Sequence, residues 1–582
     1  MPTTKKEVVA RGWDTLDVIL FTGDAYVDHP SFGAAVIGRV LENNGLKVAI
    51  VPQPNWQDDL RDFKKLGKPN LFFGVTAGAM DSMVNHYTAF KRLRHNDAYT
   101  PGDRHGARPD YATIVYSNIL KDLFPDVPLV IGGIEASLRR FTHYDYWSDN
   151  LKQSILIDSK ADMLVYGMGE KPIVEIANSL ITGKNIRDLH DIHQTAFITD
   201  INKTIDTNNW KSIELNSHAD CLNSKIKFAE NFKNIETESN KLYQDRIIQI
   251  TGKNKLVVNP ALKPLGEKEI DAIYDLPFTR LPHPKYYKKP AIPAYEMIKH
   301  SIIIHRGCFG GCSFCTISAH QGKFISSRTQ ASILKEVDAI TNMPDFKGYI
   351  TDIGGPSANM YKMKGIKPDI CKSCKRYSCI HPSICSNLNT SHADLLQLYR
   401  KINSIDKIKK VSIGSGIRYD LIFNDKNKDR EKSVNKKYLH QLISKHTSGR
   451  LKVAPEHTSD TVLNAMRKPS FKLFKTLKRE FDNINKKENL NYQLIPYFIS
   501  SHPACTNGDM NELMLQAKQM DLITEQAQDF TPTPMTLATV MYYTGFDPYT
   551  MKKVYVAHSI KDKKYQNNFF FKGKQQLPHK SS

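Results

Sequence analysis

The sequence has no long hydrophobic run. None of its 582 residues lies in an uninterrupted apolar stretch approaching about 18 residues, as a membrane-spanning helix requires. The first nine residues are polar and lack the apolar core of a secretory signal. The nine cysteines fall mostly in spacings typical of metal ligands, which disfavours an extracellular disulfide scaffold. We therefore expect a cytoplasmic protein with no membrane partner.

The charge of the chain is strongly unbalanced but not concentrated. Lys and Arg total 81 against 60 Asp and Glu, a formal net charge of +21. The excess is spread over Lys- and Asn-rich segments such as residues 424–437 and 483–489. That spread favours solvated faces over a focused nucleic-acid footprint, although charge alone leaves nucleic acid open as a partner.

One cysteine motif dominates the chain. Cys308, Cys312 and Cys315 have the spacing C-x3-C-x2-C, among several glycines and after a short apolar run at residues 301–304. Cysteine thiolates hold iron–sulfur clusters, and three of them leave one iron of a 4Fe–4S cube without a protein ligand. A zinc site would need a fourth ligand, for which His305 or His320 is available. The spacing favours the 4Fe–4S cluster.

The motif resembles the signature of radical S-adenosylmethionine (SAM) enzymes, including Phe314 before the last cysteine. The fuller string of residues 306–322 is similar to the YgiQ family of radical SAM proteins. This resemblance implies that SAM binds the open iron, with Phe314 near the cofactor, and is cleaved reductively to a 5′-deoxyadenosyl radical. It also implies an electron donor such as flavodoxin or ferredoxin. It names neither the substrate nor a catalytic residue.

Residues 1–200 are expected to form an open parallel α/β, Rossmann-like domain. Apolar runs at residues 17–21, 47–51, 70–74 and 128–132 read as buried strands, with a helix near 32–43. Gly132–Gly133 and residues 167–170 fall at strand ends, where open α/β sheets bind ligands.

This part resembles the cobalamin-binding-like domain of related radical SAM enzymes. The lower-ligand motif D-x-H-x-x-G is absent, because His29 follows Asp28 directly. Cobalamin is therefore kept as an alternative cofactor, beside a substrate-recognition or vestigial role for the domain.

Residues 201–295 are expected to be a linker with one helix near 225–244, followed by a proline-marked extended arm. Residues 296–520 alternate strands and helices again and predict a partial (β/α) TIM-type barrel. Residues 521–582 are expected to be a short C-terminal extension whose tail, from 572, is disordered.

Polar residues and glycines are expected at the mouth of this barrel. The resemblance implies that Gly354–Gly355 bind the amino group of the SAM methionine moiety and that Ser415 lies near the cofactor. It also implies positions near the cofactor or substrate for Arg418 and Asp420. Further polar residues end later strands, where barrel enzymes place their chemistry: Glu456, His457 and His502. Ala504 stands where family members usually have glycine after His-Pro.

A second set of cysteines lies between the second and third barrel strands. Cys371, Cys374, Cys379 and Cys385 have the spacing C-x2-C-x4-C-x5-C. Four thiolates suit either a structural zinc ion or an auxiliary iron–sulfur cluster, and the sequence leaves both open.

The sequence therefore predicts a radical SAM enzyme of unknown substrate. Two alternatives are a cobalamin-dependent radical SAM methyltransferase and a non-catalytic, metal-binding nucleic-acid module.

Overall fold

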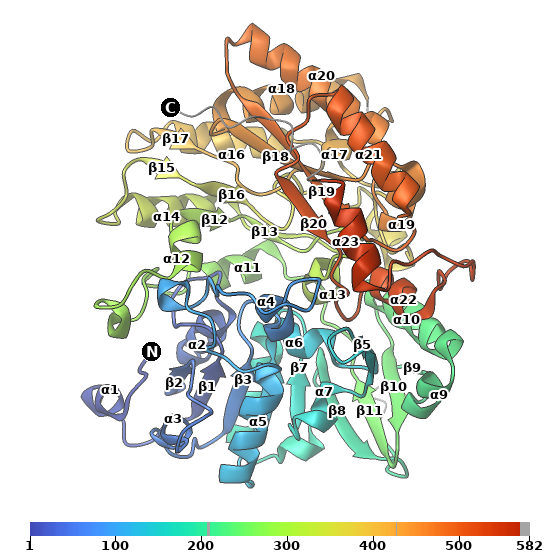
Figure 1. Cartoon of the computed structure of the whole chain (residues 1–582). Helices are drawn as coiled ribbons and strands as arrows, with labels where there is room; N and C mark the ends of the chain where they lie inside the picture. The colour runs from blue at the N-terminus through green and yellow to red at the C-terminus, as the bar shows by residue number, and fades with distance from the viewer. Residues whose placement is uncertain (206–209, 427, 571–582) are drawn as a thin grey trace. The chain divides into compact units, whose positions relative to one another are not determined.

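The computed structural model describes residues 1–205, 210–426 and 428–570 (Figure 1). These residues fall into two compact units. The N-terminal unit comprises residues 1–299, 319–322 and 533–535, and the barrel unit comprises 300–318, 323–532 and the chain from 536 onward. The tail from residue 572, predicted to be disordered, lies outside the described residues.

The N-terminal unit is built on a sheet of nine strands in its described part, in the order β2-β1-β3-β4-β7-β8-β11-β10-β9. The first five strands of that order are mutually parallel, and β8 and β11 pair antiparallel with their neighbours. The fold class predicted for this region is confirmed. The strands are β1 (Val18–Thr22), β2 (Val48–Pro52), β3 (Phe72–Thr76), β4 (Leu129–Gly132), β7 (Met163–Val165), β8 (Thr195–Asp200), β9 (Ser212–Glu214), β10 (Arg246–Thr251) and β11 (Asn254–Val258).

The central strands are apolar throughout because both faces of the sheet are covered. Alternate residues of β1 enter two different cores: Ile19 and Phe21 join one, and Val18 and Leu20 join the other. Helices contribute to both cores, beside the neighbouring strands (Figure 1). These helices are α2 (Gly33–Asn43), α5 (Ala112–Leu123), α6 (Gly133–Leu138) and α8 (Glu170–Ile181).

The linker predicted for residues 201–295 is wrong in its first half. Strands β9, β10 and β11 extend the sheet, and helices α9 (His218–Asn223) and α10 (Lys225–Ser239) accompany them. The polar composition that indicated a linker belongs mainly to α10 and to the edge strand β9, which is exposed or half-buried along its length, whereas β10 and β11 are mostly buried. The second part of the predicted linker does lack strands: residues 259–300, between β11 and β12, contain helices α11 (Glu267–Tyr274) and α12 (Pro293–Ile298).

The barrel unit alternates parallel strands with helices, as predicted. β12 pairs with β16, β15 pairs with β17, and β18, β19 and β20 form a parallel sheet. β15 and β16 are successive halves of one strand, interrupted at Thr351. The strands are β12 (Ser301–Ile303), β15 (Tyr349–Ile350), β16 (Asp352–Gly354), β17 (Lys410–Val411), β18 (Arg450–Glu456), β19 (Gln493–Ser500) and β20 (Gln526–Asp529).

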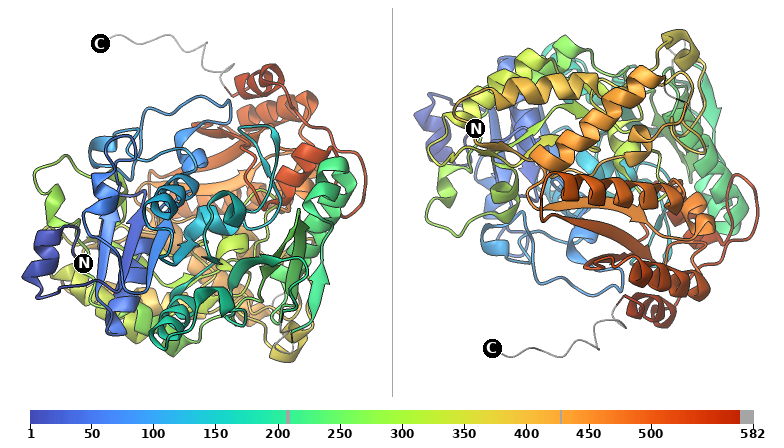
Figure 2. Two further views of the ribbon diagram at one scale, coloured as in Figure 1. Left: turned by 90° about the horizontal axis from the view of Figure 1, so that it is seen from below. Right: turned by 90° about the horizontal axis from the view of Figure 1, so that it is seen from above.

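Helices alternate with these strands in chain order and pack one against the next (Figure 2). Their apolar faces and the strands enclose one large core that runs from Ile302 to Phe570. β20, α22 (Leu537–Thr544) and α23 (Ile560–Asn568) lie in the predicted C-terminal extension, and β20 completes the β18–β19 sheet. The longer helices between the strands are α14 (Gln330–Thr341), α16 (Ala393–Asn403), α18 (Asp429–His446), α19 (Asp460–Met466), α20 (Phe471–Lys487) and α21 (Asn507–Gln519).

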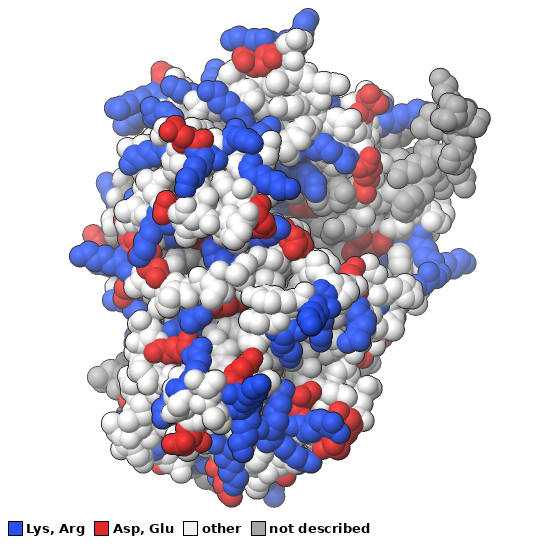
Figure 3. Space-filling model, turned by 90° about the vertical axis from the view of Figure 1, so that its left-hand side faces the viewer, with Lys and Arg blue, Asp and Glu red and all other residues white. Residues whose placement is uncertain are grey.

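The surface agrees with a spread of positive charge. On the face drawn in Figure 3, Lys and Arg side chains lie among Asp and Glu side chains. Among the described helices, none is both long enough and apolar enough to cross a bilayer. The cytoplasmic compartment and a nucleic-acid partner remain predictions from the sequence.

Candidate metal centre

The loop of Cys308, Cys312 and Cys315 follows the first barrel strand and the short strand β13 (His305–Arg306). The backbone N–H of Gly310 points at the Cys308 sulfur, with 3.4 Å from N to Sγ. A Cβ on Gly310 would lie 3.3 Å from the Cys308 sulfur and 3.9 Å from the Cys312 sulfur. A glycine is therefore suited to the centre of this loop, where the backbone itself approaches the thiols.

A buried arginine contacts the same loop. Arg418 Nη1 lies 3.4 Å from the Cys312 sulfur, and the guanidinium also donates to both oxygens of Asp420. The sequence placed Arg418 and Asp420 near the cofactor, and the structure brings Arg418 to a cysteine of the loop. A guanidinium at this position stabilises negative charge on the sulfur.

Several residues hold the loop from outside, and no motif in the sequence points to them. Ser378 Oγ donates to the carbonyl oxygens of Phe309 (3.1 Å) and Gly310 (2.8 Å). The Ser313 N–H donates to Met466 O (3.1 Å), and the Ser313 carbonyl accepts from Ala538 N (2.8 Å). These bonds run from three separate segments, so only the tertiary fold reveals them.

The donor set fits a 4Fe–4S cluster with one open iron. Burial raises the pKa of the Cys315 thiol to about 12, and the Cys312 and Cys308 thiols act on it in the same direction. The three sulfurs therefore lie within electrostatic reach of one another. Three thiols on one loop suit a 4Fe–4S cluster, because each can bind a different iron and leave the fourth iron open.

The glycine turn after the second strand is packed too tightly for any side chain. A Cβ on Gly354 would lie 2.7 Å from Ser415 Oγ, and a Cβ on Gly355 would lie 2.6 Å from the His305 ring. The Ser415 hydroxyl donates to Asp352, whose Oδ1 also accepts from Ser415 N (3.1 Å) and Gly414 N (2.8 Å). Asp352, which the sequence reasoning missed, thus fixes the predicted Ser415 against the predicted Gly354.

The remaining polar residues at strand ends are buried, and one of them touches the cysteine loop. His502 Nε2 is 3.0 Å from Ser313 Oγ, and its ring meets Phe314 edge-on at 6.0 Å between centroids. Glu456 faces Lys468 at 3.5 Å. His457 Nε2 lies 3.5 Å from the Cys505 sulfur. His502 therefore positions the loop, whereas Glu456 and His457 contact other partners.

The second cysteine set also forms one neighbourhood. Burial raises the pKa of the Cys379 thiol to about 11, and the three other thiols of the set act in the same direction. Cys379 N donates to Phe309 O (3.1 Å), which joins this set to the first loop. Asn387 Nδ2 lies 3.5 Å from the Cys371 sulfur.

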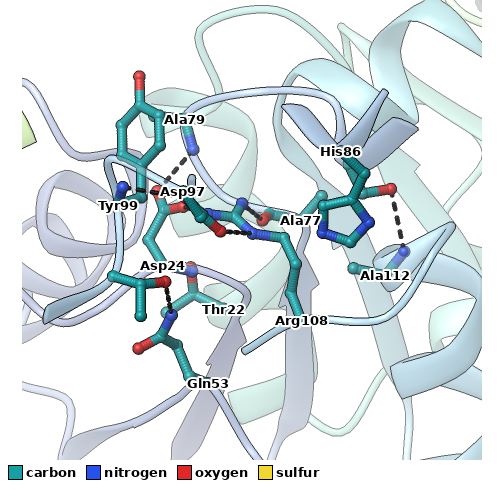
Figure 4. A network of polar contacts seen from close by, with 12 residues as sticks. Thr22, Asp24, Gln53, Ala77, Ala79, His86, Asp97, Tyr99, Arg108 and Ala112 are labelled. Carbon is teal, nitrogen blue, oxygen red and sulfur yellow. Dashed lines mark hydrogen bonds and ion pairs between the residues drawn. The ribbon is translucent and has the colours of Figure 1, made fainter. Parts of the chain in front are cut away.

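The strand ends of the N-terminal unit are filled by buried ion pairs. Arg108 donates to both oxygens of Asp97 (3.0 and 3.1 Å) and to Ala77 O (2.8 Å), and its Nη2 lies 2.9 Å from Asp24 Oδ1 (Figure 4). Asp24 Oδ2 in turn accepts from Ala79 N at 2.7 Å. Asp24 and Ala77–Ala79 follow β1 and β3, so this network occupies the carboxyl edge of the sheet.

The predicted glycine turns of this unit serve packing. Gly133 has φ +82°, and a Cβ there would lie 2.3 Å from Thr76 Oγ1.

Glu170 lines a groove of about 550 Å³ together with residues of α2, α8 and α11. His29 is buried, and its Nδ1 accepts from Ser31 N at 3.1 Å.

Comparison with known proteins identifies the class. Residues 1–301 match the family model described as "Radical SAM N-terminal", and residues 525–573 match a domain of unknown function, DUF3362. The first match covers just over half of the chain and places it among radical SAM proteins with this N-terminal domain.

Full-length relatives give the narrower family. UPF0313 proteins of Porphyromonas gingivalis and Bacteroides thetaiotaomicron are 60% and 59% identical, and each match covers 98% of this chain and at least 90% of the relative. A relative from Methanocella arvoryzae is 47% identical over 96% of this chain and 91% of its own length. The chain belongs to the UPF0313 family. These relatives do not carry the name YgiQ, which stays a prediction.

Solved structures with lower similarity include two radical SAM proteins. The methyltransferase TsrM from Kitasatospora setae, with cobalamin and a [4Fe-4S] cluster bound, gives a TM-score of 0.49 at 14% identity, covering 90% of this chain and 74% of TsrM. The cobalamin-dependent enzyme OxsB gives 0.48 at 11% identity, covering 88% and 53%.

Proposed function

We propose that this protein is a radical SAM enzyme whose catalytic 4Fe–4S cluster is held by Cys308, Cys312 and Cys315. One observation carries the proposal: the three cysteines lie on one loop after the first barrel strand, where Gly310 approaches the Cys308 and Cys312 sulfurs and Arg418 lies 3.4 Å from the Cys312 sulfur. When bound, the reduced cluster supplies the electron that cleaves SAM into methionine and a 5′-deoxyadenosyl radical. The substrate of that radical is left unassigned.

The chain's own residues would prepare the site in three ways. The three thiolates would hold the cluster, and Arg418 would offset their negative charge. The Gly354–Gly355 turn would present backbone groups to the amino end of SAM, because glycine has no side chain of its own to cover them. Ser378 and His502 would keep the loop in place, as partners of metal-binding segments commonly do. An external electron donor such as flavodoxin or ferredoxin would reduce the cluster.

Anaerobic reconstitution followed by a SAM-cleavage assay tests the proposal. With dithionite as reductant, the wild-type chain should release 5′-deoxyadenosine and methionine, and Cys312→Ala should reduce release at least about 100-fold. Cys221→Ala is the matched control, because that cysteine is buried in the N-terminal unit and belongs to neither set. Retained cleavage in Cys312→Ala, or none in a wild-type chain carrying the cluster, would contradict the assignment.

Neither alternative is favoured by a specific contact. For a cobalamin-dependent methyltransferase, the carboxyl edge of the N-terminal sheet would have to receive the corrin, and the Arg108 network occupies the ends of β1 and β3 there. Reconstitution with hydroxocobalamin and gel filtration measures this directly, by corrin absorbance that elutes with the protein. A non-catalytic nucleic-acid module would leave the radical SAM family match without a role.

A further inference from the structure

A buried lysine, Lys323, lies against the cysteine-rich insertion of the barrel unit, and the proposed function does not use its positive charge. Lys323 is only 2% exposed. Its Nζ donates to Arg376 O at 2.6 Å and lies 4.0 Å from the Cys374 sulfur. Among the described residues, no carboxylate forms an ion pair with it. A buried ammonium is costly unless negative charge lies nearby, and the neighbouring groups able to carry that charge are thiols.

The backbone of the insertion is shaped around its sulfurs. Cys374 N donates to Cys371 O (3.3 Å), and Cys385 N donates to Cys379 O (2.8 Å), so the four residues are drawn together in two turns. A Cβ on Gly365 would lie 2.4 Å from the Cys371 sulfur, as close backbone approach to a ligand sulfur requires. The same relation holds between Gly310 and Cys308 in the first loop.

Four thiolates at this spacing suit either a zinc ion or a 4Fe–4S cluster. The contact with the first loop favours the cluster. Cys379 N donates to Phe309 O, inside the loop that carries Cys308 and Cys312. A second cluster beside the first could exchange electrons with it, whereas a zinc ion has no redox chemistry.

An apolar cluster also joins the insertion to the first loop. Cys379 and Cys385 pack against a small apolar cluster that contains Phe309, Met360 and Ile380 and that also touches Cys308. Low polarity and exclusion of water stabilise iron–sulfur clusters and set their potentials.

We propose that Cys371, Cys374, Cys379 and Cys385 hold a second, fully cysteine-ligated 4Fe–4S cluster, with Lys323 as its buried counter-charge. This site is independent of SAM, because four protein ligands leave no open iron. Its test can therefore fail while the radical SAM function stands, and the reverse.

Metal analysis of the full-length chain, purified and reconstituted without oxygen, separates the two sites. The wild-type chain should contain about eight irons and eight sulfides, and a variant with all three first-loop cysteines changed to Ala should keep about four. A variant with all four insertion cysteines changed to Ser should also keep about four irons and still cleave SAM at a measurable rate. Cys221→Ala should lose none. Circular dichroism checks that each variant is folded.

Two results would overturn the proposal. About four irons with one zinc in the wild-type chain, the zinc lost in the four-serine variant, would make the insertion a structural zinc site. About four irons and no zinc would leave four free thiols. If iron is lost only from the first-loop variant, the radical SAM function stands alone; if it is lost only from the four-serine variant, that function fails and this proposal holds.

Lys323→Met gives a second measurement that does not depend on loss of the fold. Removing a positive charge beside a cluster should lower its reduction potential, since the reduced cluster carries more negative charge. An EPR-monitored redox titration should show one of the two clusters shifted to lower potential, and the three-alanine first-loop variant should retain that shifted signal. Unchanged potentials in Lys323→Met would contradict the assigned counter-charge.

Discussion

Both units end parallel strands in polar residues, but they use those residues differently. In the N-terminal unit, Asp24, Asp97 and Arg108 neutralise one another at the ends of β1 and β3. In the barrel unit, the residues after the strands converge on a cysteine loop, through Arg418 on Cys312 and His502 on Ser313. One strand edge is closed by its own charges, and the other supports thiols. The carboxyl edge of a sheet offers a place for chemistry, and the partners available there decide whether it is used.

The largest expected effect is on the charges that close the N-terminal edge. Arg108→Met leaves Asp24 and Asp97 buried without their cation, and we expect a loss of about 3–5 kcal/mol in the free energy of unfolding. Chemical denaturation followed by circular dichroism measures it. Arg61→Met is the control, because the Arg61–Asp59 pair is exposed and should change stability by about 0–1 kcal/mol.

The two strand edges should also differ in their effect on SAM cleavage. Folded Arg108→Met should cleave SAM as well as the wild-type chain when both are compared per cluster. A deficit as deep as that of Cys312→Ala would mean that the N-terminal edge takes part in the chemistry, and the contrast between the two edges would be wrong.

Ser378 tests how the barrel unit holds its loop. Ser378→Ala removes the hydroxyl that donates to the carbonyls of Phe309 and Gly310, and loss of such a supporting contact typically weakens metal retention about 10–100-fold. Iron release to a chelator should be faster by that factor. Ser373→Ala, an exposed serine of the same insertion, should release iron at the wild-type rate. Equal rates in both variants would remove Ser378 from the support of the loop.

Buried histidines should make both units sensitive to acid. Burial lowers the pKa of His392 to about 4 and that of His143 to about 3. Asn359 Nδ2 donates to His392 Nε2, and Asn435 Oδ1 accepts at Nδ1, so the ring is held neutral. The unfolded chain binds a proton near pH 6.5 and the folded chain does not. Stability is therefore full above that pH and falls as the pH drops toward 4, by about 1.4 kcal/mol per pH unit for each histidine.

Denaturation at several pH values between 7 and about 4.5 measures this slope. His392→Gln should reduce this slope by about 1.4 kcal/mol per pH unit, the contribution of one proton. The exposed His95→Gln should leave the slope unchanged. A wild-type slope that His392→Gln does not alter would place the acid sensitivity elsewhere.

The smallest effect concerns turns with positive φ. Ala504 has φ +75°, a conformation that suits glycine, so Ala504→Gly should stabilise the protein by about 0.5–1 kcal/mol. Gly133 occupies a comparable conformation beside Thr76, and Gly133→Ala should destabilise by about 1–3 kcal/mol. Ala339→Gly, at an exposed position in the last turn of α14, is the control and should cost up to about 1 kcal/mol. Thermal melts rank the three, and a destabilised Ala504→Gly would show that the alanine methyl contributes more than the strain removes.

The sequence by itself determined the elements and the ligand candidates. Apolar runs predicted β1 to β4 because a doubly covered strand must be apolar throughout, and the cysteine spacing picked out both thiol sets because cluster ligands are close in sequence. It failed at residues 201–258, where polar residues fit an exposed sheet margin as well as a linker. Only the tertiary structure supplied Asp352, Ser378, Lys323 and the Arg108 network. Each of these acts on residues at least 10 positions away in the chain, and a sequence pattern carries no record of contacts made by folding.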